Sequence, residues 1–347
     1  MYGYNGFNPY NNHYQNNEFE AYRREQNRLL RRDANYVGFG MLGLLAAMQF
    51  TYLLACLLLI ALRIIPAQAL RQADLGLGNT VYLVFYMLVY MVAMGFPMLT
   101  VSLIARRRVN PFSPAQKVGA VNFLLALAAG LAMCIIANFA ASYIMSFLQA
   151  FGIQQPSMPD TMVNTPLSLG LNIVIFAVLP AFLEEMVFRG YVLQALRPHG
   201  DGMAIVVSAL LFGLMHGNVL QIPFAFLIGL VLGYVVVQAD NIWVAVCIHF
   251  LNNFMSVMLQ YAGFHINSDE ALNRLTLMVF VIIGLAGLGA VIALAARRSR
   301  LVQQVQGSRS PLTASERAGA LLSAPAFTVA VVLFVIVAML SIEFAPV

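Results

Sequence analysis

Hydrophobic residues fill long stretches of this chain, and polar residues gather in short segments between them. An apolar run of about 20 residues is long enough to cross the hydrocarbon core of a bilayer as a helix. The pattern therefore predicts an all-α fold, a polytopic transmembrane helical bundle with about 8–9 membrane-spanning helices. The nine runs are Val37–Leu62, Val81–Ala105, Val118–Ala150, Leu167–Leu196, Met203–His216, Leu220–Gln238, Ile242–Tyr261, Leu275–Ala296 and Ala324–Ile342.

The apolar runs differ in length, and their lengths predict how each helix crosses the bilayer. The first, third and fourth runs are longer than a bilayer requires, so we expect tilted helices or interfacial extensions. The fifth run, Met203–His216, is short. We expect it to lean on neighbouring helices or to end at membrane depth, where polar groups gather.

The polar segments divide the chain into four parts. Residues 1–35 are rich in Tyr, Asn and Gln and lack an apolar stretch, so they predict a disordered, basic cytoplasmic arm, with 19–32 as a candidate interfacial helix. Residues 36–298 form the predicted transmembrane helical domain. A polar cytoplasmic linker at 299–322 then leads to a C-terminal transmembrane helix at 323–347.

Composition and charge agree with a membrane location. Hydrophobic residues make up 61% of the chain and charged residues 10%, which excludes an ordinary soluble domain. The arginines cluster in the N-terminal arm, at 106–108, at Arg197 and at 297–300, all on one side if the spans alternate. The positive-inside rule then predicts a cytoplasmic N-terminus and an external C-terminus in a bacterial-type plasma membrane, although the connection at 63–80 carries two arginines.

The net charge and the cysteines add little further chemistry. The formal net charge of +5 is explained by the topology, so we expect the lipid bilayer as a partner and no nucleic acid. Cys56, Cys134 and Cys247 all lie in apolar runs without CxxC spacing, which predicts buried thiols.

A few ionisable residues interrupt the apolar runs. Of the 14 acidic residues, Glu184 and Glu185 alone lie deep in a run, and His216 and His249 are the embedded histidines among the five. An intramembrane ionisable group must be compensated and is a candidate for function. At about 1.5 Å per residue, Glu184 and His216 lie about 20 Å from the inner ends of their runs and His249 about 10 Å. These side chains therefore share a middle-to-inner layer.

Helical spacing sorts these residues by face, because residues four apart lie on one side of a helix. Glu185 can pair with Arg189, which leaves Glu184 about 100° away and free for another role. Two more such pairs follow on later runs, Phe212 with His216 and His249 with Asn253; Asn252 is a rival to Asn253 as the functional amide.

One free carboxylate, two imidazoles and an amide suit hydrolysis of an amide bond. Glu184 would accept a proton from water, and His216 would hold or polarise the same water. His249 and Asn253 would donate hydrogen bonds to the developing oxyanion. The same atoms could instead bind a divalent metal, with Glu184, His216 and His249 as a zinc set. The chain lacks an HExxH pair, so we favour direct Glu/His activation that requires no cofactor.

Other classes of protein remain open at this point. A buried ion network would account for the glutamates and Arg189 without catalysis. A non-enzymatic membrane scaffold regulating cell-wall or bacteriocin-immunity partners would retain the same fold. A proton-coupled transporter would use Glu184 as a relay, but such folds show repeated halves with broken helices, and the sequence has no internal repeat.

The order of these motifs resembles the CPBP intramembrane protease family, also called Abi or the CAAX prenyl protease 2 type. The motifs read Glu184-Glu185-Met-Val-Phe-Arg189, Phe212-Gly-Leu-Met-His216 and His249-Phe-Leu-Asn-Asn253, within a protease core at about 165–262. The resemblance implies an intramembrane endopeptidase that cleaves a membrane-associated or lipidated protein or peptide, prenylated substrates included. It also implies that Glu184 and His216 activate water, that His249 and Asn253 stabilise the oxyanion, and that Glu185 and Arg189 are structural. Such proteins are commonly labelled metalloproteases.

Overall fold

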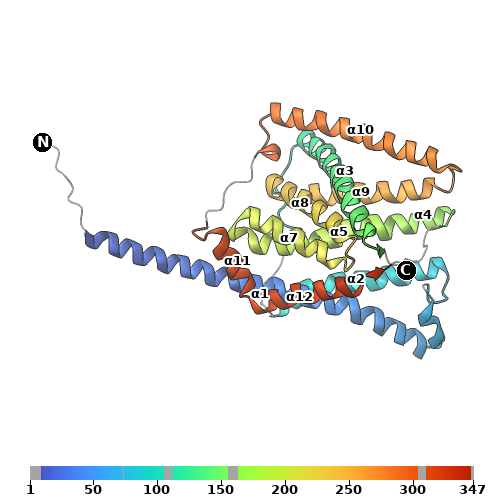
Figure 1. Ribbon diagram of the computed structural model, residues 1–347, viewed down its shortest axis with the longest axis horizontal. Coiled ribbons are helices and arrows are strands. Elements are labelled where there is room, and N and C mark those ends of the chain that lie inside the picture. Colours follow the sequence, from blue (N-terminus) through green and yellow to red (C-terminus); the bar gives the residue numbers. More distant parts are fainter. Residues whose placement is uncertain are drawn as a thin grey trace.

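The computed structural model describes residues 9–72, 74–104, 110, 112–154, 163–303 and 310–344. Helices make up nearly all of this part of the chain, as the apolar pattern predicts (Figure 1). One pair of two-residue strands is also present, β1 (Ile153–Gln154) antiparallel to β2 (Glu343–Phe344). The α-helices are α1 (Pro9–Ala61), α2 (Asn79–Ile104), α3 (Ala120–Ala150), α4 (Pro166–Ile173), α5 (Leu179–Glu185), α6 (Leu193–Leu196), α7 (Asp201–Met215), α8 (Ile222–Ala239), α9 (Ile242–Ala262), α10 (Asp269–Ala296), α11 (Ala314–Leu322) and α12 (Pro325–Leu340).

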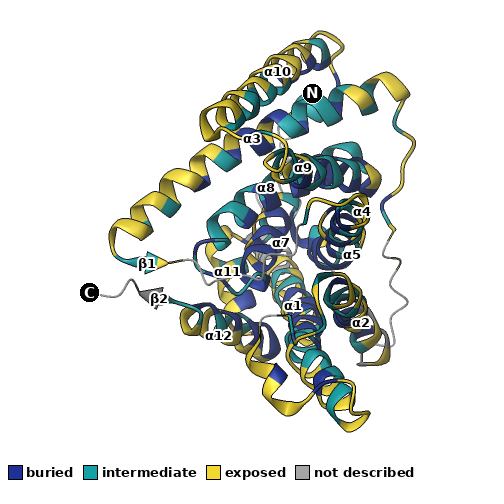
Figure 2. Cartoon of the chain, turned by 90° about the vertical axis from the view of Figure 1, so that its right-hand side faces the viewer, coloured by how far each residue is buried: buried dark blue, intermediate teal, exposed yellow. Residues whose placement is uncertain are grey.

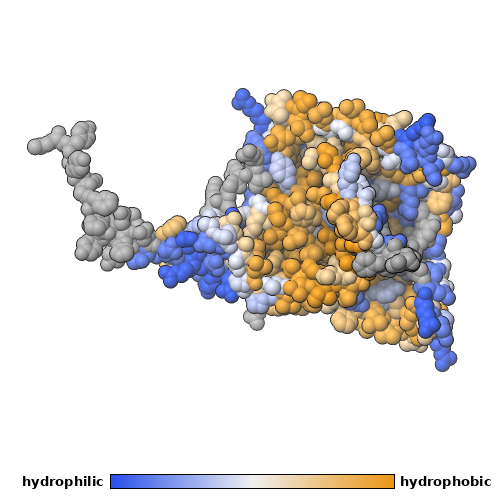
Figure 3. Space-filling model, in the orientation of Figure 1, coloured by the Kyte–Doolittle hydropathy of each residue, from blue (hydrophilic) through white to orange (hydrophobic). Residues whose placement is uncertain are grey.

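The long helices form a membrane-spanning bundle. Within the described residues, seven helices are long and apolar enough to cross a bilayer, and the pair α11–α12, bent by 80°, makes an eighth if it is counted as one span. On the face seen in Figure 3, hydrophobic residues form a broad band, and hydrophilic residues lie at its two ends. The fifth predicted run is α7, a shorter helix of 15 residues. The fold class is therefore confirmed, with fewer full spans than the nine apolar runs.

The first helix corrects the expected disordered arm. Residues 1–8 lie outside the described part of the chain, but α1 is continuous from Pro9 into the membrane. Ion pairs one turn apart, at 2.7 Å between Glu20 and Arg23 and at 2.8 Å between Glu25 and Arg28, favour this helix. Composition alone favours disorder in this arm, because it carries no information about the tertiary contacts that stabilise the helix.

Those tertiary contacts hold the inner half of α1 against the rest of the protein. Leu30 and Ala34 are fully buried, and Asp33 lies 3.1 Å from the ring of His199, just after the helix that carries the glutamates. The hydroxyl of Tyr191 donates a hydrogen bond of 2.5 Å to the backbone carbonyl of Tyr36. The predicted arm is therefore partly a structural helix of the bundle.

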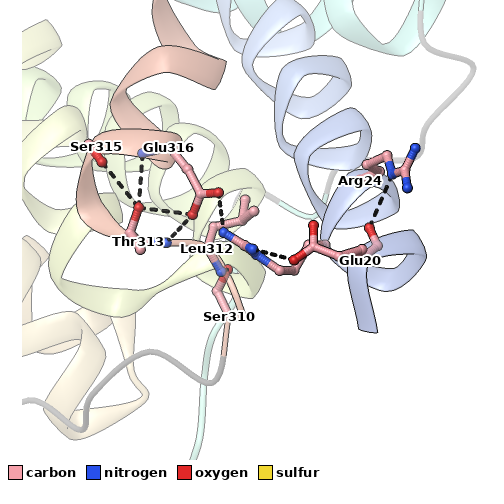
Figure 4. Close-up of polar contacts among 8 residues, drawn as sticks. Glu20, Arg24, Ser310, Leu312, Thr313, Ser315 and Glu316 are labelled. Atoms are coloured by element: carbon pink, nitrogen blue, oxygen red, sulfur yellow. Dashed lines mark hydrogen bonds and ion pairs between the residues drawn. The ribbon is translucent and has the colours of Figure 1, made fainter. Parts of the chain in front are cut away.

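The polar linker predicted at 299–322 contains the short helix α11. A capping box starts this helix: the Thr313 hydroxyl accepts from the Glu316 backbone N–H, and the Glu316 carboxylate accepts from the Thr313 backbone N–H. Glu316 also pairs with Arg23 of α1, and Figure 4 shows this start of α11 beside Glu20 and Arg24. The linker is thereby fixed against α1.

The helices that carry the candidate residues lie in the middle of the bundle. Viewed end on, α1, α2 and α12 lie on one side and α3 and α10 on the other, with α4–α5 and α7–α9 between them (Figure 2). Glycines allow close packing here: a Cβ on Gly229 of α8 would lie 2.9 Å from the backbone Cα of Ala209 on α7. This central position buries the candidate residues while the outer helices face lipid.

Candidate active site

The two glutamates lie on a helix with irregular turns. The helix runs from Pro166 to His199, and π-helical turns at Val174–Val178 and Met186–Val192 flank α5. Pro180, near the start of α5, has no N–H to donate to the preceding turn, which accounts for a widened turn before it. Single π-helical turns inside α-helices are frequent at functional sites.

The structure contains the Glu185–Arg189 pair that the i,i+4 spacing predicts. Both side chains are fully buried, and Arg189 Nη1 lies 2.8 Å from Glu185 Oε1. Arg189 Nη2 donates to the backbone carbonyl of Gly229 at 3.1 Å, and the guanidinium lies 4.6 Å from the centre of the Phe212 ring. The arginine therefore ties the glutamate helix to α7 and α8.

Glu185 has a second partner that the spacing does not predict. His249 Nδ1 lies 2.9 Å from Glu185 Oε1, close enough to donate its proton to the carboxylate. This contact leaves His249 Nε2 facing Glu184, whose Oε2 lies 3.8 Å away. Glu185 thus orients the imidazole, and a neighbouring carboxylate of this kind fixes which ring nitrogen is presented to the site.

The two oxygens of Glu184 face different helices: Oε2 lies toward His249 on α9, and Oε1 lies toward α2. Its side chain is almost fully buried, and its Oε1 accepts a hydrogen bond of 2.6 Å from the hydroxyl of Tyr90. Sequence reasoning missed Tyr90 because the aromatic residues of the second run were treated as packing residues. A signal was present: Tyr82, Tyr86 and Tyr90 recur every fourth residue, and their rings stack at centroid distances of 6.4 and 6.2 Å.

His216 caps the short helix α7. The helix ends at Met215, and Gly217 reverses the chain with a φ of +62°, a conformation that favours glycine. The fifth run therefore ends as a helix of 15 residues, shorter than the helices long enough to span a bilayer. His216 Nδ1 lies 2.9 Å from the backbone carbonyl of Phe212, to which it donates, so its Nε2 is free to accept a hydrogen bond.

Phe212 brings the two imidazoles together. Its ring packs edge-to-face with His216 at a centroid distance of 5.1 Å and with His249 at 6.0 Å. The same ring stacks below Arg189. Phe212 is therefore a common support for both histidines and for the buried cation.

The two candidate amides contact each other. Asn252 is buried, and its Nδ2 donates to Asn253 Oδ1 at 3.2 Å. This hydrogen bond occupies the carbonyl oxygen of Asn253 and leaves its Nδ2 as a donor for another group. Asn253 is half-buried, so it is the more accessible of the two amides.

A cavity of about 530 Å³ unites these residues. Its lining includes Glu184, His216, His249, Asn252 and Asn253, together with Phe212 and the tyrosine stripe of α2. Glu185 and Arg189 do not line it; they support it from behind. Among the described residues, no three His, Cys, Asp or Glu side chains lie close enough together to hold a metal ion. Glu184, His216 and His249, the residues of the alternative zinc set, line this one cavity.

Comparison with known proteins adds an independent observation. Residues 166–255 match the family model described as Type II CAAX prenyl endopeptidase Rce1-like. This match supports the resemblance of the segment to the CPBP/CAAX protease family. The Rce1-like segment carries the glutamate helix, α7, α8 and most of α9, and so includes every candidate residue except Tyr90. No curated protein and no solved structure matches the chain significantly.

The cysteines take no part in the site. Cys56 and Cys134 are buried, Cys247 is half-buried, and all three are free thiols, in agreement with the sequence interpretation.

The match and the apolar bundle together indicate an integral membrane protein with a protease-family core.

Proposed function

We propose that the protein is an intramembrane endopeptidase that hydrolyses a peptide bond in a membrane-associated or lipidated protein or peptide. A water molecule held between Glu184 and Nε2 of His216 would be the nucleophile. Glu184 takes its proton as general base, and then delivers that proton to the leaving amine. Tyr90 holds one oxygen of Glu184, so the other oxygen is directed toward the reacting atoms.

His249 and Asn253 would stabilise the tetrahedral oxyanion. Asn253 donates from Nδ2, and His249 donates from Nε2 when its imidazole carries a second proton. The ring is held for this role by its contacts with two carboxylates, since His249 Nε2 lies 3.8 Å from Glu184 and its Nδ1 lies 2.9 Å from Glu185. Hydrogen-bond donors in a water-poor cavity stabilise developing charge more strongly than they would in water.

The observation that carries this proposal is the single cavity lined by Glu184, His216, His249 and Asn253, inside the segment that matches a prenyl endopeptidase model. A non-enzymatic scaffold has no need to gather these four side chains around one cavity. The proposed mechanism uses no metal, because Glu184 and His216 would activate the water directly.

The test is digestion of a peptide library, prenylated members included, by the purified protein in lipid nanodiscs. Glu184→Gln keeps the shape of the side chain but removes the base, so cleavage should fall by about 10²–10⁴-fold. Glu270→Gln, which alters an exposed acid, is the matched control and should cleave normally. Cleavage that persists in Glu184→Gln would contradict the proposal, and loss of cleavage with a chelator followed by recovery with zinc would contradict its metal-free form.

A further inference from the structure

We propose that the substrate peptide reaches Glu184 from the arginine-poor end of the bundle, through the tyrosine-lined part of the cavity. With the N-terminus in the cytoplasm, this end faces the extracytoplasmic side. The inference rests on the proposed protease function and defines its substrate class: an uncharged, extended segment of a membrane-anchored or exported protein that is exposed outside the cytoplasm.

The cavity extends from the candidate residues toward that end. Tyr82 lies three residues after the start of α2 and Gln260 two residues before the end of α9, and both line the cavity together with Glu184. At about 1.5 Å per residue, Tyr82 lies about 12 Å from Tyr90 along α2, and Gln260 about 16 Å from His249 along α9. Gln260 is exposed, whereas His249 is buried. The lining therefore leads outward from the catalytic layer to the surface.

The short hairpin of α7 and α8 creates this space. Helix α7 begins and helix α8 ends at the arginine-rich end. Because α7 has 15 residues, the turn at His216–Gln221 lies about 22 Å from that end, inside the bilayer. Packing agrees with this depth, since a Cβ on Gly217 would lie 3.3 Å from Val337, which lies about 18 Å from the start of α12 at about 1.5 Å per residue. Beyond the turn, α2, α4–α5 and α9 enclose the cavity without a central helix to fill it.

The opposite direction is closed. Between Glu185 and the arginine-rich end, the glutamate helix buries Phe188, Arg189, Val192, Leu193 and Leu196, each fully inaccessible. Arg189 is fully buried and bonded to Glu185 and to the carbonyl of Gly229, so the packed core closes the cavity behind the histidines. A peptide arriving from the arginine-rich end would have to displace this core, which native packing density does not allow without local unfolding.

The side chains that line the tyrosine-lined part of the cavity indicate which kind of peptide it can hold. Outside the catalytic layer, its polar lining consists of tyrosine hydroxyls and the carboxamides of Gln221 and Gln260, with no Asp, Glu, Lys or Arg among the lining residues described. Amide and hydroxyl groups can bond the N–H and C=O groups of an extended peptide, and the tyrosine faces pack against its apolar side chains. A charged residue near the scissile bond would remain without a counter-ion in this cavity, which is costly.

Cysteine labelling tests the entry side without requiring activity. In a chain with Cys56, Cys134 and Cys247 replaced by Ala, Tyr86→Cys and Gln260→Cys are reacted with a membrane-impermeant sulfonated maleimide, in intact cells and in inverted membrane vesicles. Phe264→Cys marks the arginine-poor end and Arg300→Cys the arginine-rich end, because both positions are exposed. We expect Tyr86→Cys and Gln260→Cys to label together with Phe264→Cys, in intact cells.

Two results overturn the inference. Entry from the arginine-poor end is excluded if Tyr86→Cys labels from the same side as Arg300→Cys. It is also excluded if Tyr86→Cys labels from neither side, provided that the denatured protein labels fully. Labelling of Phe264→Cys only in inverted vesicles overturns the extracytoplasmic assignment. In a second arm, labelling of Tyr86→Cys should reduce library cleavage relative to the same unlabelled variant, and labelling of Phe264→Cys should not. Absence of cleavage before labelling refutes the proposed function and leaves the entry result valid.

Discussion

His249 Nδ1 and Arg189 Nη1 both contact the same oxygen of Glu185, at 2.9 and 2.8 Å. The buried ion pair is therefore part of the site: the carboxylate that neutralises the arginine also orients the histidine. Arg189 and His249 come from different helices, so Glu185 joins the glutamate helix to α9 at the depth of the cavity.

Glu185→Gln should destabilise the protein and misplace His249. Removing one partner of a buried ion pair costs about 3–5 kcal/mol, because the remaining charge lacks compensation. Thermal unfolding in lipid nanodiscs measures the loss. The double variant Glu185→Gln with Arg189→Met should lose less than the sum of the two single losses. Additive losses would show that the two side chains do not depend on each other.

Tyr90→Phe should lower the rate of cleavage while leaving substrate affinity unchanged. The hydroxyl contacts only the base among the proposed reacting groups, and hydrogen bonds to charged groups contribute about 1.5–3 kcal/mol. We therefore expect kcat to fall about tenfold or more with little change in KM. Tyr143→Phe, at a side chain that is 78% exposed on α3, is the matched control. A KM effect in place of a kcat effect would assign Tyr90 to substrate binding.

The two neighbouring asparagines should differ in their effect on catalysis. Asn253→Ala removes the proposed oxyanion donor and should lower kcat by about 10²–10³-fold. Asn252→Ala removes the group that holds the carbonyl of Asn253, so its effect should be smaller. Parallel kinetic measurements on one cleaved library peptide decide between them. Loss of activity in Asn252→Ala alone would reverse the assignment.

Gly229→Ala should destabilise the bundle through the contact between α7 and α8. The added Cβ would lie 2.9 Å from both Cα and Cβ of Ala209, and Gly229 also supplies the carbonyl that Arg189 contacts. Overpacking of this kind costs about 1–3 kcal/mol. Gly284→Ala on α10 is the control, since its Cβ would meet no atom within 4 Å. Equal melting temperatures for the two variants would contradict this account.

The sequence predicts the helical bundle well because the apolar runs are long and interrupted by arginine-rich connections. It also predicts the Glu185–Arg189 pair, because this contact is local and follows from i,i+4 spacing. The contact between Glu185 and His249 joins residues 64 positions apart, and no local rule specifies it. The contact between Tyr90 and Glu184 spans 94 positions and is likewise not specified by a local rule, although the tyrosines at every fourth residue of α2 mark one face of that helix.

Two features depend on packing that composition does not reveal. The arm before residue 35 reads as disordered because it is polar, but its inner half buries Leu30 and Ala34 and forms helix. π-helical turns flank α5 on both sides, and Pro180 accounts only for the turn before it. The positions of Glu184 and Glu185 relative to α2 and α9 follow from these turns and could not be derived from ideal helix geometry.

The unbroken first helix has a mechanical consequence. Between Pro9 and Arg23 it extends about 20 Å, at about 1.5 Å per residue, beyond the ion pair of Arg23 with Glu316 on α11, while Tyr36 is bonded to Tyr191 on the glutamate helix. A stiff rod held at Arg23 and again at Tyr36 behaves as a lever arm. A force applied at its far tip would be transmitted as torque to the turn that follows Glu185.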